Sequence, residues 1–286
     1  MANVAYGEHE RQVLDFWKAP ASDNKPTPLV FYMHGGAWMN GDKAEIGKHG
    51  LVEKYLAAGI SVVSISYRFV RDAQAAQVKP PVEWPMHDAA RALQFVRSKA
   101  AEWNIDKQRI ALSGSSAGAC TSLWLAFHDD MADPKSSDPI ARESTRVWCA
   151  AVDVAQTSLD PQQMTEWTPN SRYGAHAFGF VSPKDFANNE QIYKEFLTRR
   201  SEFLSWIKEY SPYEQASAGD PPVYLYYPTP PALGQPQKDP THTANFGVKL
   251  KEKLDQLGVE CELVYPGAPN VKHKSIETYL IEKLKK

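Results

Sequence analysis

The sequence predicts an α/β fold with a mostly parallel sheet. Short runs rich in β-branched and aromatic residues alternate with longer stretches in which apolar residues recur at helical spacing. The run at residues 146–152 shows no alternation of polar and apolar side chains, which is usual for parallel strands covered on both faces. With 286 residues, of which 43% are apolar and 23% are charged, the chain can form a sizeable core.

The β-branched and aromatic runs predict the strands. Turn residues bound several of them, including Gly59 before the second run and the segment from Asn104 to Lys107 before the third. Strands are predicted over residues 29–33, 60–67, 109–113, 146–152, 223–227 and 261–265.

Apolar residues at helical spacing predict the helices between these strands. In the first helix Leu51 and Tyr55 follow that spacing, and Gly59 supplies the C-terminal stop. The third helix is rich in small residues, which predicts a buried position. Helices are predicted over residues of about 43–58, 84–103, 116–126, 243–257 and 275–285.

One segment interrupts this alternation. Residues 157–218 are aromatic, polar and biased toward helix, and they contain no strand pattern. We interpret them as a helical cap inserted into a sheet domain formed by residues 1–156 and 219–286. The proline-rich stretch at 228–236 is a stiff loop, too short to link independent domains.

Composition and charge exclude several classes of protein. The net charge is −2 and no basic stripe is present, so nucleic acid is not expected as a partner. The longest strongly apolar stretch, around Ile60 to Ile65, falls far short of the roughly 20 residues that span a bilayer, so no membrane insertion is expected. The N-terminus lacks the features of a signal peptide. This predicts a cytoplasmic location for the chain as it stands, and a periplasmic or secreted one if a leader has been removed.

The sequence indicates no metal site and no cofactor. Cys120, Cys149 and Cys261 have no CxxC spacing, so neither zinc nor a disulfide framework is expected, and all three are predicted to be buried. The run from His128 to Asp130, with further aspartates after it, is interpreted as a solvated acidic turn.

The segment Gly114-Ser115-Ser116-Ala117-Gly118 carries the clearest chemical pattern. It follows a predicted strand and opens a predicted helix. A serine in such a sharp turn projects its hydroxyl above the sheet, and the flanking glycines relieve backbone crowding. The amides at the start of the helix favour developing negative charge there. Ser116 is therefore the candidate nucleophile; the alternative is a glycine- and serine-rich turn that only caps a helix.

A second motif, His34-Gly35-Gly36-Ala37-Trp38, follows the strand at 29–33. Glycines there let backbone N–H groups approach a substrate oxygen, as acyl transfer through a tetrahedral intermediate requires. His34 is predicted to hold this loop by hydrogen bonds and to carry no proton.

Together, HGGAW and GSSAG resemble the α/β-hydrolase fold and, within it, the HGG-type esterases and lipases related to hormone-sensitive lipase and to bacterial carboxylesterases. The resemblance implies an oxyanion hole formed by the backbone N–H groups of Gly36, Ala37 and Ala117. Ala37 stands where many relatives have a third glycine, and it is expected to serve if its φ is negative.

In this fold the triad follows the chain order serine, acid, histidine. Asp239 is the only carboxylate between the strand at 223–227 and the next helix, and His273 is the only histidine after the last strand. Both are predicted to complete the triad. The alternative for Asp239 is an ordinary turn residue ahead of a helix, in which case Asp153 or Asp160 supplies the acid. His242 is predicted to be a solvated residue at a helix start, on the wrong side of the last strand to be the base.

Substrate contacts are expected from Trp38 and Ser115 in the two motifs and from aromatic residues of the cap. The cap aromatics either line an acyl or alcohol pocket or form the small core of the cap. They include Trp167, Tyr173 and Phe178, with His176 and Phe180.

The predicted function is a serine carboxylesterase that cleaves short-chain or small-molecule esters through an acyl-enzyme intermediate. Kynurenine formamidases also pair HGGxW with GxSxG, and Trp38 matches them, so an aryl formamide is an alternative substrate. A polysaccharide acetyl or feruloyl esterase is a second alternative. A binding protein that kept the fold without catalysis is a third, disfavoured because a candidate for every catalytic role is present.

Overall fold

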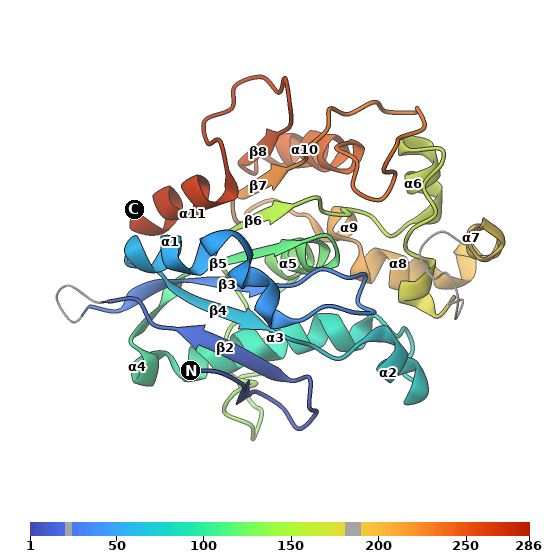
Figure 1. Ribbon diagram of the computed structural model, residues 1–286. Coiled ribbons are helices and arrows are strands. Elements are labelled where there is room, and N and C mark those ends of the chain that lie inside the picture. The colour runs from blue at the N-terminus through green and yellow to red at the C-terminus, as the bar shows by residue number, and fades with distance from the viewer. Residues whose placement is uncertain (21–24, 181–189) are drawn as a thin grey trace.

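The computed structural model describes residues 1–20, 25–180 and 190–286, and it contains one mixed sheet with helices on both faces (Figure 1). Within these residues the strand order is β1-β2-β4-β3-β5-β6-β7-β8. The first two strands pair antiparallel, and every pair from β4 to β8 is parallel. The strands are β1 (Val4–Ala5), β2 (Val13–Trp17), β3 (Thr27–Met33), β4 (Ser61–Ile65), β5 (Ile105–Ser115), β6 (Cys149–Asp153), β7 (Val223–Tyr226) and β8 (Cys261–Val264).

The helices connect these strands and include several short 3-10 turns, labelled η. They are η1 (Lys43–Gly50), α1 (Leu51–Ala57), α2 (Val70–Ala75), α3 (Glu83–Ser98), α4 (Ala100–Trp103), α5 (Ala117–Phe127), α6 (Pro161–Trp167), η2 (Ala175–Phe178), α7 (Glu190–Thr198), η3 (Arg200–Phe203), α8 (Leu204–Tyr210), α9 (Pro212–Gln215), α10 (Asn245–Leu257) and α11 (Ile276–Lys285).

The predicted α/β class and its six parallel strands are confirmed, with differences at the edges. The strand β2 was not predicted, although Leu14 and Phe16 alternate with partly exposed residues and are buried. The helix predicted over 43–58 begins as a 3-10 helix and becomes α-helical after Gly50, whose φ of 64° breaks the regular geometry. The helix predicted over 84–103 is divided at Lys99.

Two apolar cores cover the two faces of the sheet. Along β3, Val30 faces one core, while Leu29 and Phe31 face the other. The smaller core packs under η1, α1 and α11, and the larger one under α3, α5 and the helices between β6 and β7. Because both faces are covered, the central parallel strands β3, β4 and β6 are buried over most of their length.

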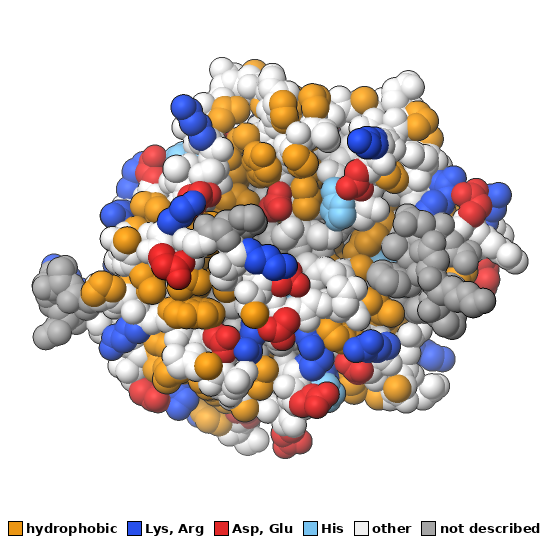
Figure 2. Space-filling model, viewed as in Figure 1, with side chains coloured by type: hydrophobic (Ala, Val, Ile, Leu, Met, Phe, Trp, Pro, Cys, Tyr) orange, Lys and Arg blue, Asp and Glu red, His pale blue; other side chains and the backbone are white. Residues whose placement is uncertain are grey.

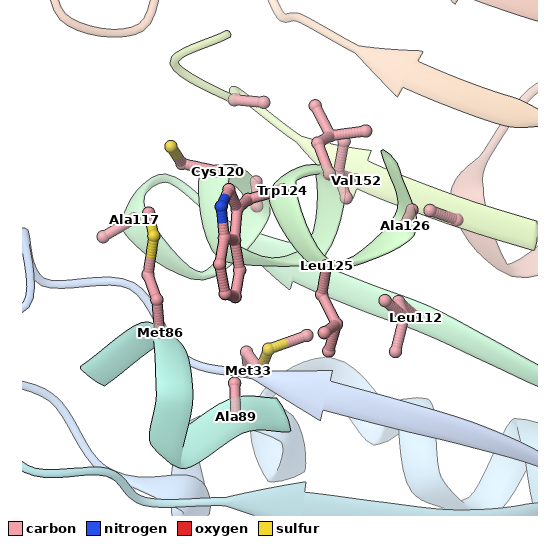
Figure 3. Close-up of a cluster of buried hydrophobic side chains, with 14 of the residues drawn as sticks. Met33, Met86, Ala89, Leu112, Ala117, Cys120, Trp124, Leu125, Ala126 and Val152 are labelled. Atoms are coloured by element: carbon pink, nitrogen blue, oxygen red, sulfur yellow. The ribbon is translucent and has the colours of Figure 1, made fainter. Parts of the chain in front are cut away.

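Helix α5 lies at the centre of the larger core (Figure 3). All its residues are buried, in agreement with the prediction from its small side chains. Leu125 and Trp124 point into the cluster that contains Met33 of β3 and Met86 of α3, and Val152 of β6 lies on the other side (Figure 3). Helix α5 is thereby packed between α3 and strands of the sheet.

The described residues between β6 and β7 contain helices and no strand, and we call this segment the cap. It contacts the sheet domain at several points. The Trp124 indole Nε1–H of α5 donates to the Glu209 carbonyl at 2.8 Å, and the Val82 N–H before α3 donates to the Ala177 carbonyl at 3.0 Å. The cap is thus held directly over α3 and α5.

The surface carries charges of both signs, interspersed with apolar side chains over the face in Figure 2. Among the described helices, none is both long and apolar enough to cross a bilayer. All three cysteines are free; Cys120 and Cys149 are buried and Cys261 is partly buried.

A close backbone contact joins β3, β5 and α5. A Cβ built on Gly118 would lie 2.1 Å from the Met33 carbonyl oxygen, and one on Gly114 would lie 2.6 Å from the carbonyl carbon of Gly118. Neither position has room for a side chain, since the opposing atoms belong to the backbone.

We therefore predict that Gly118→Ala lowers the free energy of unfolding by about 1–3 kcal/mol, the usual cost of overpacking a core. The matched control is Gly47→Ala in η1, where an added Cβ meets nothing within 4 Å. Urea denaturation measures both changes. Equal stabilities for the two variants would contradict the packing described here.

Candidate active site

Ser116 occupies a strained turn between β5 and α5. Its φ of 52° and ψ of −119° lie outside the regions that non-glycine residues usually adopt. The Ser116 N–H donates to the Asp153 carbonyl at 3.0 Å, which ties the turn to the end of β6. Such strain persists only where surrounding contacts enforce it, and it is concentrated at functional sites. The turn predicted from GSSAG is therefore present.

The Ser116 hydroxyl contacts a histidine on a different loop from the one predicted. Its Oγ lies 3.0 Å from Nε2 of His242. The other ring nitrogen of His242, Nδ1, lies 2.9 Å from Oδ2 of Asp239. The three side chains thus form the serine, histidine and carboxylate relay that activates a serine nucleophile.

Asp239 and His242 both lie on the loop between β7 and α10. The N–H groups of Thr241 and His242 each donate to Asp239 Oδ1 at 3.2 Å, so the carboxylate organises the turn that also carries the histidine. Gln156 Nε2 donates to the Thr241 carbonyl at 2.8 Å from beyond β6. Asp239 was predicted as the acid, and the structure brings it to Ser116 through His242.

The cap also holds this loop. Asn170 donates from Nδ2 to the Gln237 carbonyl at 2.8 Å and accepts from the Gln237 N–H at 2.9 Å. Asn245, buried at the start of α10, donates from Nδ2 to the carbonyl of Trp167 at 2.8 Å and accepts from the Ala232 N–H at 2.8 Å. The position of the relay therefore depends on contacts between the cap and the β7–α10 loop.

His273 does not reach Ser116, and its prediction as the base is wrong. Its Nδ1 lies 2.6 Å from Glu262 Oε2 and its Nε2 lies 2.9 Å from Glu282 Oε2. Burial by itself lowers the pKa of His273, but the hydrogen bonds and charges of these two glutamates outweigh burial and raise that pKa. Both ring nitrogens of His273 thus contact carboxylates, one on β8 and one on α11. Neither nitrogen contacts Ser116.

The sequence contained one local signal for His242. Asp239 lies three residues before it in a turn, and an aspartate in a turn accepts hydrogen bonds from the backbone just after it, which brings His242 near its carboxylate. Chain order alone led to the rejection of His242. The prediction of a merely solvated histidine fails because Ser116 and Asp239 contact both of its ring nitrogens.

The two alternative acids have other contacts. Asp160 caps α6 by accepting from the Gln162 N–H at 2.9 Å, and it pairs with Arg200 at 2.5 Å. Asp153 accepts from the Ser115 hydroxyl at 3.2 Å, and burial raises the pKa of its carboxyl. Asp239 is the carboxylate that contacts His242.

The loop from His34 to Trp38 lies directly against the Ser116 turn. A Cβ on Gly35 would lie 3.0 Å from the Ser115 carbonyl oxygen and 3.4 Å from Ser116 Cβ. Within the described hydrogen bonds, the backbone N–H groups of Gly36, Ala37 and Ala117 have no acceptor. They are available to a substrate oxygen, as the resemblance implied.

The condition stated for Ala37, a negative φ, is not met. Gly36, Ala37 and Trp38 have φ values of 98°, 52° and 55°, so three successive residues are left-handed. The turn closes through the Met39 N–H, which donates to the Gly36 carbonyl at 2.9 Å. Alanine is accommodated at this position at a conformational cost, because only glycine adopts positive φ freely.

His34 is a structural residue of this loop. Its Nδ1 lies 2.7 Å from the Gly35 carbonyl, and its ring stacks on Tyr67 with centroids 4.1 Å apart. Burial lowers the pKa of His34 to about 4. The ring is therefore neutral near pH 7 and lies apart from the relay, in agreement with the sequence analysis.

The predicted substrate-binding aromatics are buried in the core. Trp38 is 0% exposed, and Trp167, Tyr173 and Phe178 are 8%, 1% and 4% exposed. Trp167 packs against Tyr213 with centroids 5.3 Å apart, and Phe178 packs against Phe196 at 5.5 Å. Of the two interpretations of the cap cluster, these contacts favour the core of the cap over a pocket lining.

A cavity of about 480 Å³ opens on the other side of the Ser116 turn, under η1 and the start of α11. Ser115 lines it, as does Asp153 at the end of β6. Its remaining wall is mixed, and Ile46, Leu51 and Ile276 lie there beside aromatic and charged residues. It includes the tyrosines Tyr32, Tyr55 and Tyr226 and the charged residues Glu45, Lys48, Lys274 and Glu277.

The side chains of the acidic run after α5 form hydrogen bonds with other residues of the chain. His128 Nε2 lies 3.0 Å from Glu209 Oε1, and Asp130 accepts from the Ser144 hydroxyl at 2.7 Å. No cluster of potential metal ligands occurs within the described residues.

The sheet order, the strained serine turn and the helices on both faces define an α/β-hydrolase fold. Solved structures share it. The truncated form of a carbohydrate esterase from gut microbiota superposes with a TM-score of 0.70 at 18% identity, covering 100% of this chain and 96% of that one. The propionate-bound esterase Est2 of Thermogutta terrifontis gives 0.64 at 21% identity, covering 98% and 90%.

Within that fold the chain belongs to the BD-FAE family, whose model matches residues 14–253. It is 32% identical over 117 residues to Esterase LipC of Mycobacterium tuberculosis, a match that covers 40% of this chain and 27% of the relative. The chain thus spans about a quarter to a third of the length of the first curated relatives that it matches.

Proposed function

We propose that this protein is a serine carboxylesterase that hydrolyses small or short-chain esters through an acyl-enzyme intermediate. The observation that carries the proposal is the relay from Ser116 Oγ through His242 to Asp239, with both hydrogen-bonding distances at or below 3.0 Å. The family and the esterase relatives support ester over formamide as the substrate.

In the first half of the reaction, Ser116 Oγ attacks the ester carbonyl carbon while His242 Nε2 takes the hydroxyl proton. Asp239 accepts a hydrogen bond from Nδ1–H, which fixes the tautomer of His242 and stabilises the imidazolium. The carbonyl oxygen becomes an oxyanion, and the N–H groups of Gly36, Ala37 and Ala117 stabilise it. One such donor typically contributes on the order of 10² to 10³ in rate.

The tetrahedral intermediate then collapses. The bond to the alcohol oxygen breaks, His242 returns the proton to that oxygen, and the acyl group stays on Ser116. Water next attacks the acyl carbon with His242 as general base. Release of the carboxylic acid regenerates the free serine, and no other reactant is consumed.

Two solved structures support a preference for small substrates. The esterase Est2 of Thermogutta terrifontis, which shares the fold, has propionate bound in one structure and butyrate in another. A long acyl chain gains free energy only by burying methylene groups against apolar atoms, at about 0.8 kcal/mol each. The cavity beside the Ser116 turn mixes charged residues and tyrosines with Ile46, Leu51 and Ile276, so its wall is not made of apolar side chains alone.

We predict that Ser116→Ala, His242→Ala and Asp239→Asn each lower kcat/KM for nitrophenyl butanoate by a factor of at least about 10³, since loss of a triad member removes proton transfer. The control is His273→Gln, which is expected to keep kcat/KM within about threefold, because His273 contacts Glu262 of β8 and Glu282 of α11 and not the Ser116 relay. Steady-state hydrolysis and circular dichroism measure activity and folding. Full activity in His242→Ala with loss in His273→Gln would reverse the assignment.

A nitrophenyl ester series tests the acyl preference. The acetate and butanoate esters are expected to give kcat/KM values at least about tenfold above the hexadecanoate ester, because a cavity of about 480 Å³ that mixes charged and apolar side chains buries few of the additional methylenes. Comparable turnover of butanoate and hexadecanoate would show that a long apolar channel exists.

A further inference from the structure

The oxyanion loop contains two non-glycine residues in a left-handed conformation. Gly36 adopts its φ of 98° without cost, whereas Ala37 and Trp38 have positive φ values of 52° and 55°. Backbone strain of this kind persists only when the surrounding structure over-determines it. The contacts of Trp38 therefore influence whether the loop keeps its N–H groups aimed at the substrate.

Hydrogen bonds hold Trp38 at its side chain and at its backbone. The indole Nε1–H donates to Thr121 Oγ1 of α5 at 2.9 Å, and the Trp38 carbonyl accepts from the Val70 N–H at the start of α2 at 2.9 Å. Trp38 is 0% exposed, and the ring of Tyr173 in the cap lies 6.3 Å from its ring, centroid to centroid. The residue that ends the loop is thus buried, with contacts to both α5 and the cap.

The Thr121 hydroxyl makes a second hydrogen bond, to the other half of the oxyanion hole. It donates to the Ala117 carbonyl at 2.9 Å, one turn earlier in α5. A hydroxyl has one donor hydrogen and two acceptor lone pairs, so it can accept from the indole and donate to the carbonyl at the same time. In a buried chain of this kind each bond polarises the other and strengthens it. Trp38, Thr121 and Ala117 are all 0% exposed.

This chain of two hydrogen bonds connects the two segments that form the hole. Gly36 and Ala37 belong to the loop after β3, and Ala117 belongs to the first turn of α5. Donors from both segments must reach the same oxyanion, so the position of one segment relative to the other matters for catalysis. Among the described residues, the bond between Trp38 and Thr121 is the only hydrogen bond that joins this loop to α5.

We propose that Thr121 is a positioning residue for the oxyanion hole. Through Trp38 it keeps the N–H groups of the loop in register with the N–H of Ala117 at the start of α5. Thr121 is fully buried and takes no part in proton transfer. The inference rests on the proposed esterase function, in which the N–H groups of these two segments stabilise the oxyanion.

The next residue of α5 provides a natural comparison. Ser122 is also 0% exposed, and its hydroxyl donates to the Gly118 carbonyl at 2.7 Å, one turn earlier in the helix. Its hydroxyl therefore makes the same local bond as Thr121, but it has no hydrogen bond to the oxyanion loop within the described residues. A hydroxyl that serves only the helix is thus represented by Ser122.

A positioning role has a kinetic signature. The oxyanion forms in the transition state, so misaligned donors lower kcat and kcat/KM by the same factor and leave KM nearly unchanged. A hydroxyl with a purely structural role changes the amount of folded protein, and the kcat of each intact site stays the same. Titration of active sites with a fluorophosphonate separates these two roles.

The test is Thr121→Val, which keeps the shape of the side chain and removes the hydroxyl. We expect kcat per titrated active site to fall at least about 10-fold, with KM within about threefold. The Ki of a trifluoromethyl ketone, whose adduct with Ser116 places an oxyanion in the hole, is expected to rise by a similar factor. Thr121→Ser, which restores the hydroxyl, is expected to recover most of kcat.

A second variant breaks the same bond from the other partner. Trp38→Phe keeps an aromatic ring and lacks the indole N–H, so it is expected to lower kcat per titrated site by a similar factor. The double variant is expected to lose less than the product of the two single losses, because both substitutions remove one shared interaction. If Thr121→Val does not fold, Trp38→Phe alone tests the inference.

The matched control is Ser122→Ala, with an expected kcat per titrated site within about twofold of the parent. In a parent that hydrolyses esters, an unchanged kcat in folded Thr121→Val or Trp38→Phe overturns the inference and leaves the proposed function intact. An equal loss in Ser122→Ala, or a double variant that shows the full product of the single losses, also overturns it. A parent that hydrolyses no ester overturns the proposed function, and the inference with it.

Discussion

Close backbone contact between the end of β3 and the start of α5 is the constraint on which the site depends. Gly114 and Gly118 allow it, because a Cβ on either would overlap backbone atoms of the facing segment. The contact brings the carboxyl end of β3 beside the Ser116 turn. The loop that carries Gly36 and Ala37 therefore lies next to the nucleophile. Parallel strands supply this geometry, since their carboxyl ends meet at one edge of the sheet.

The acid and the base of the site both come from a longer connection, the β7–α10 loop, and the cap holds this loop. The β7–α10 loop reaches Ser116 with both Asp239 and His242, while Asn170 of the cap holds its backbone. The loop after β8 carries a histidine too, but Glu262 and Glu282 fix it over α11. The acid and the base thus lie on one loop, while Lys274 and Glu277 near the start of α11 line the cavity beside the Ser116 turn.

How well the sequence predicted each part of the structure depends on how far apart in sequence the residues are that determine it. The Ser116 turn and the HGG loop were predictable because glycine spacing dictates backbone geometry within a few residues. The strand and helix pattern was predictable from periodicity. His242 was missed because the path of the β7–α10 loop depends on contacts between residues far apart in sequence, such as Asn170 and Gln237. The left-handed φ of Ala37 was missed for a similar reason, since Thr121 of α5 holds the adjacent Trp38 by a hydrogen bond from outside the loop.

Covalent labelling with a fluorophosphonate, followed by peptide mass mapping, tests the central claim most directly, that Ser116 is a nucleophile activated by His242. The account predicts one equivalent of label on Ser116, a labelling rate at least about 10³ lower in His242→Gln, and a rate near that of the parent in His273→Gln. Label on another residue, or slow labelling in His273→Gln with a normal rate in His242→Gln, would contradict it.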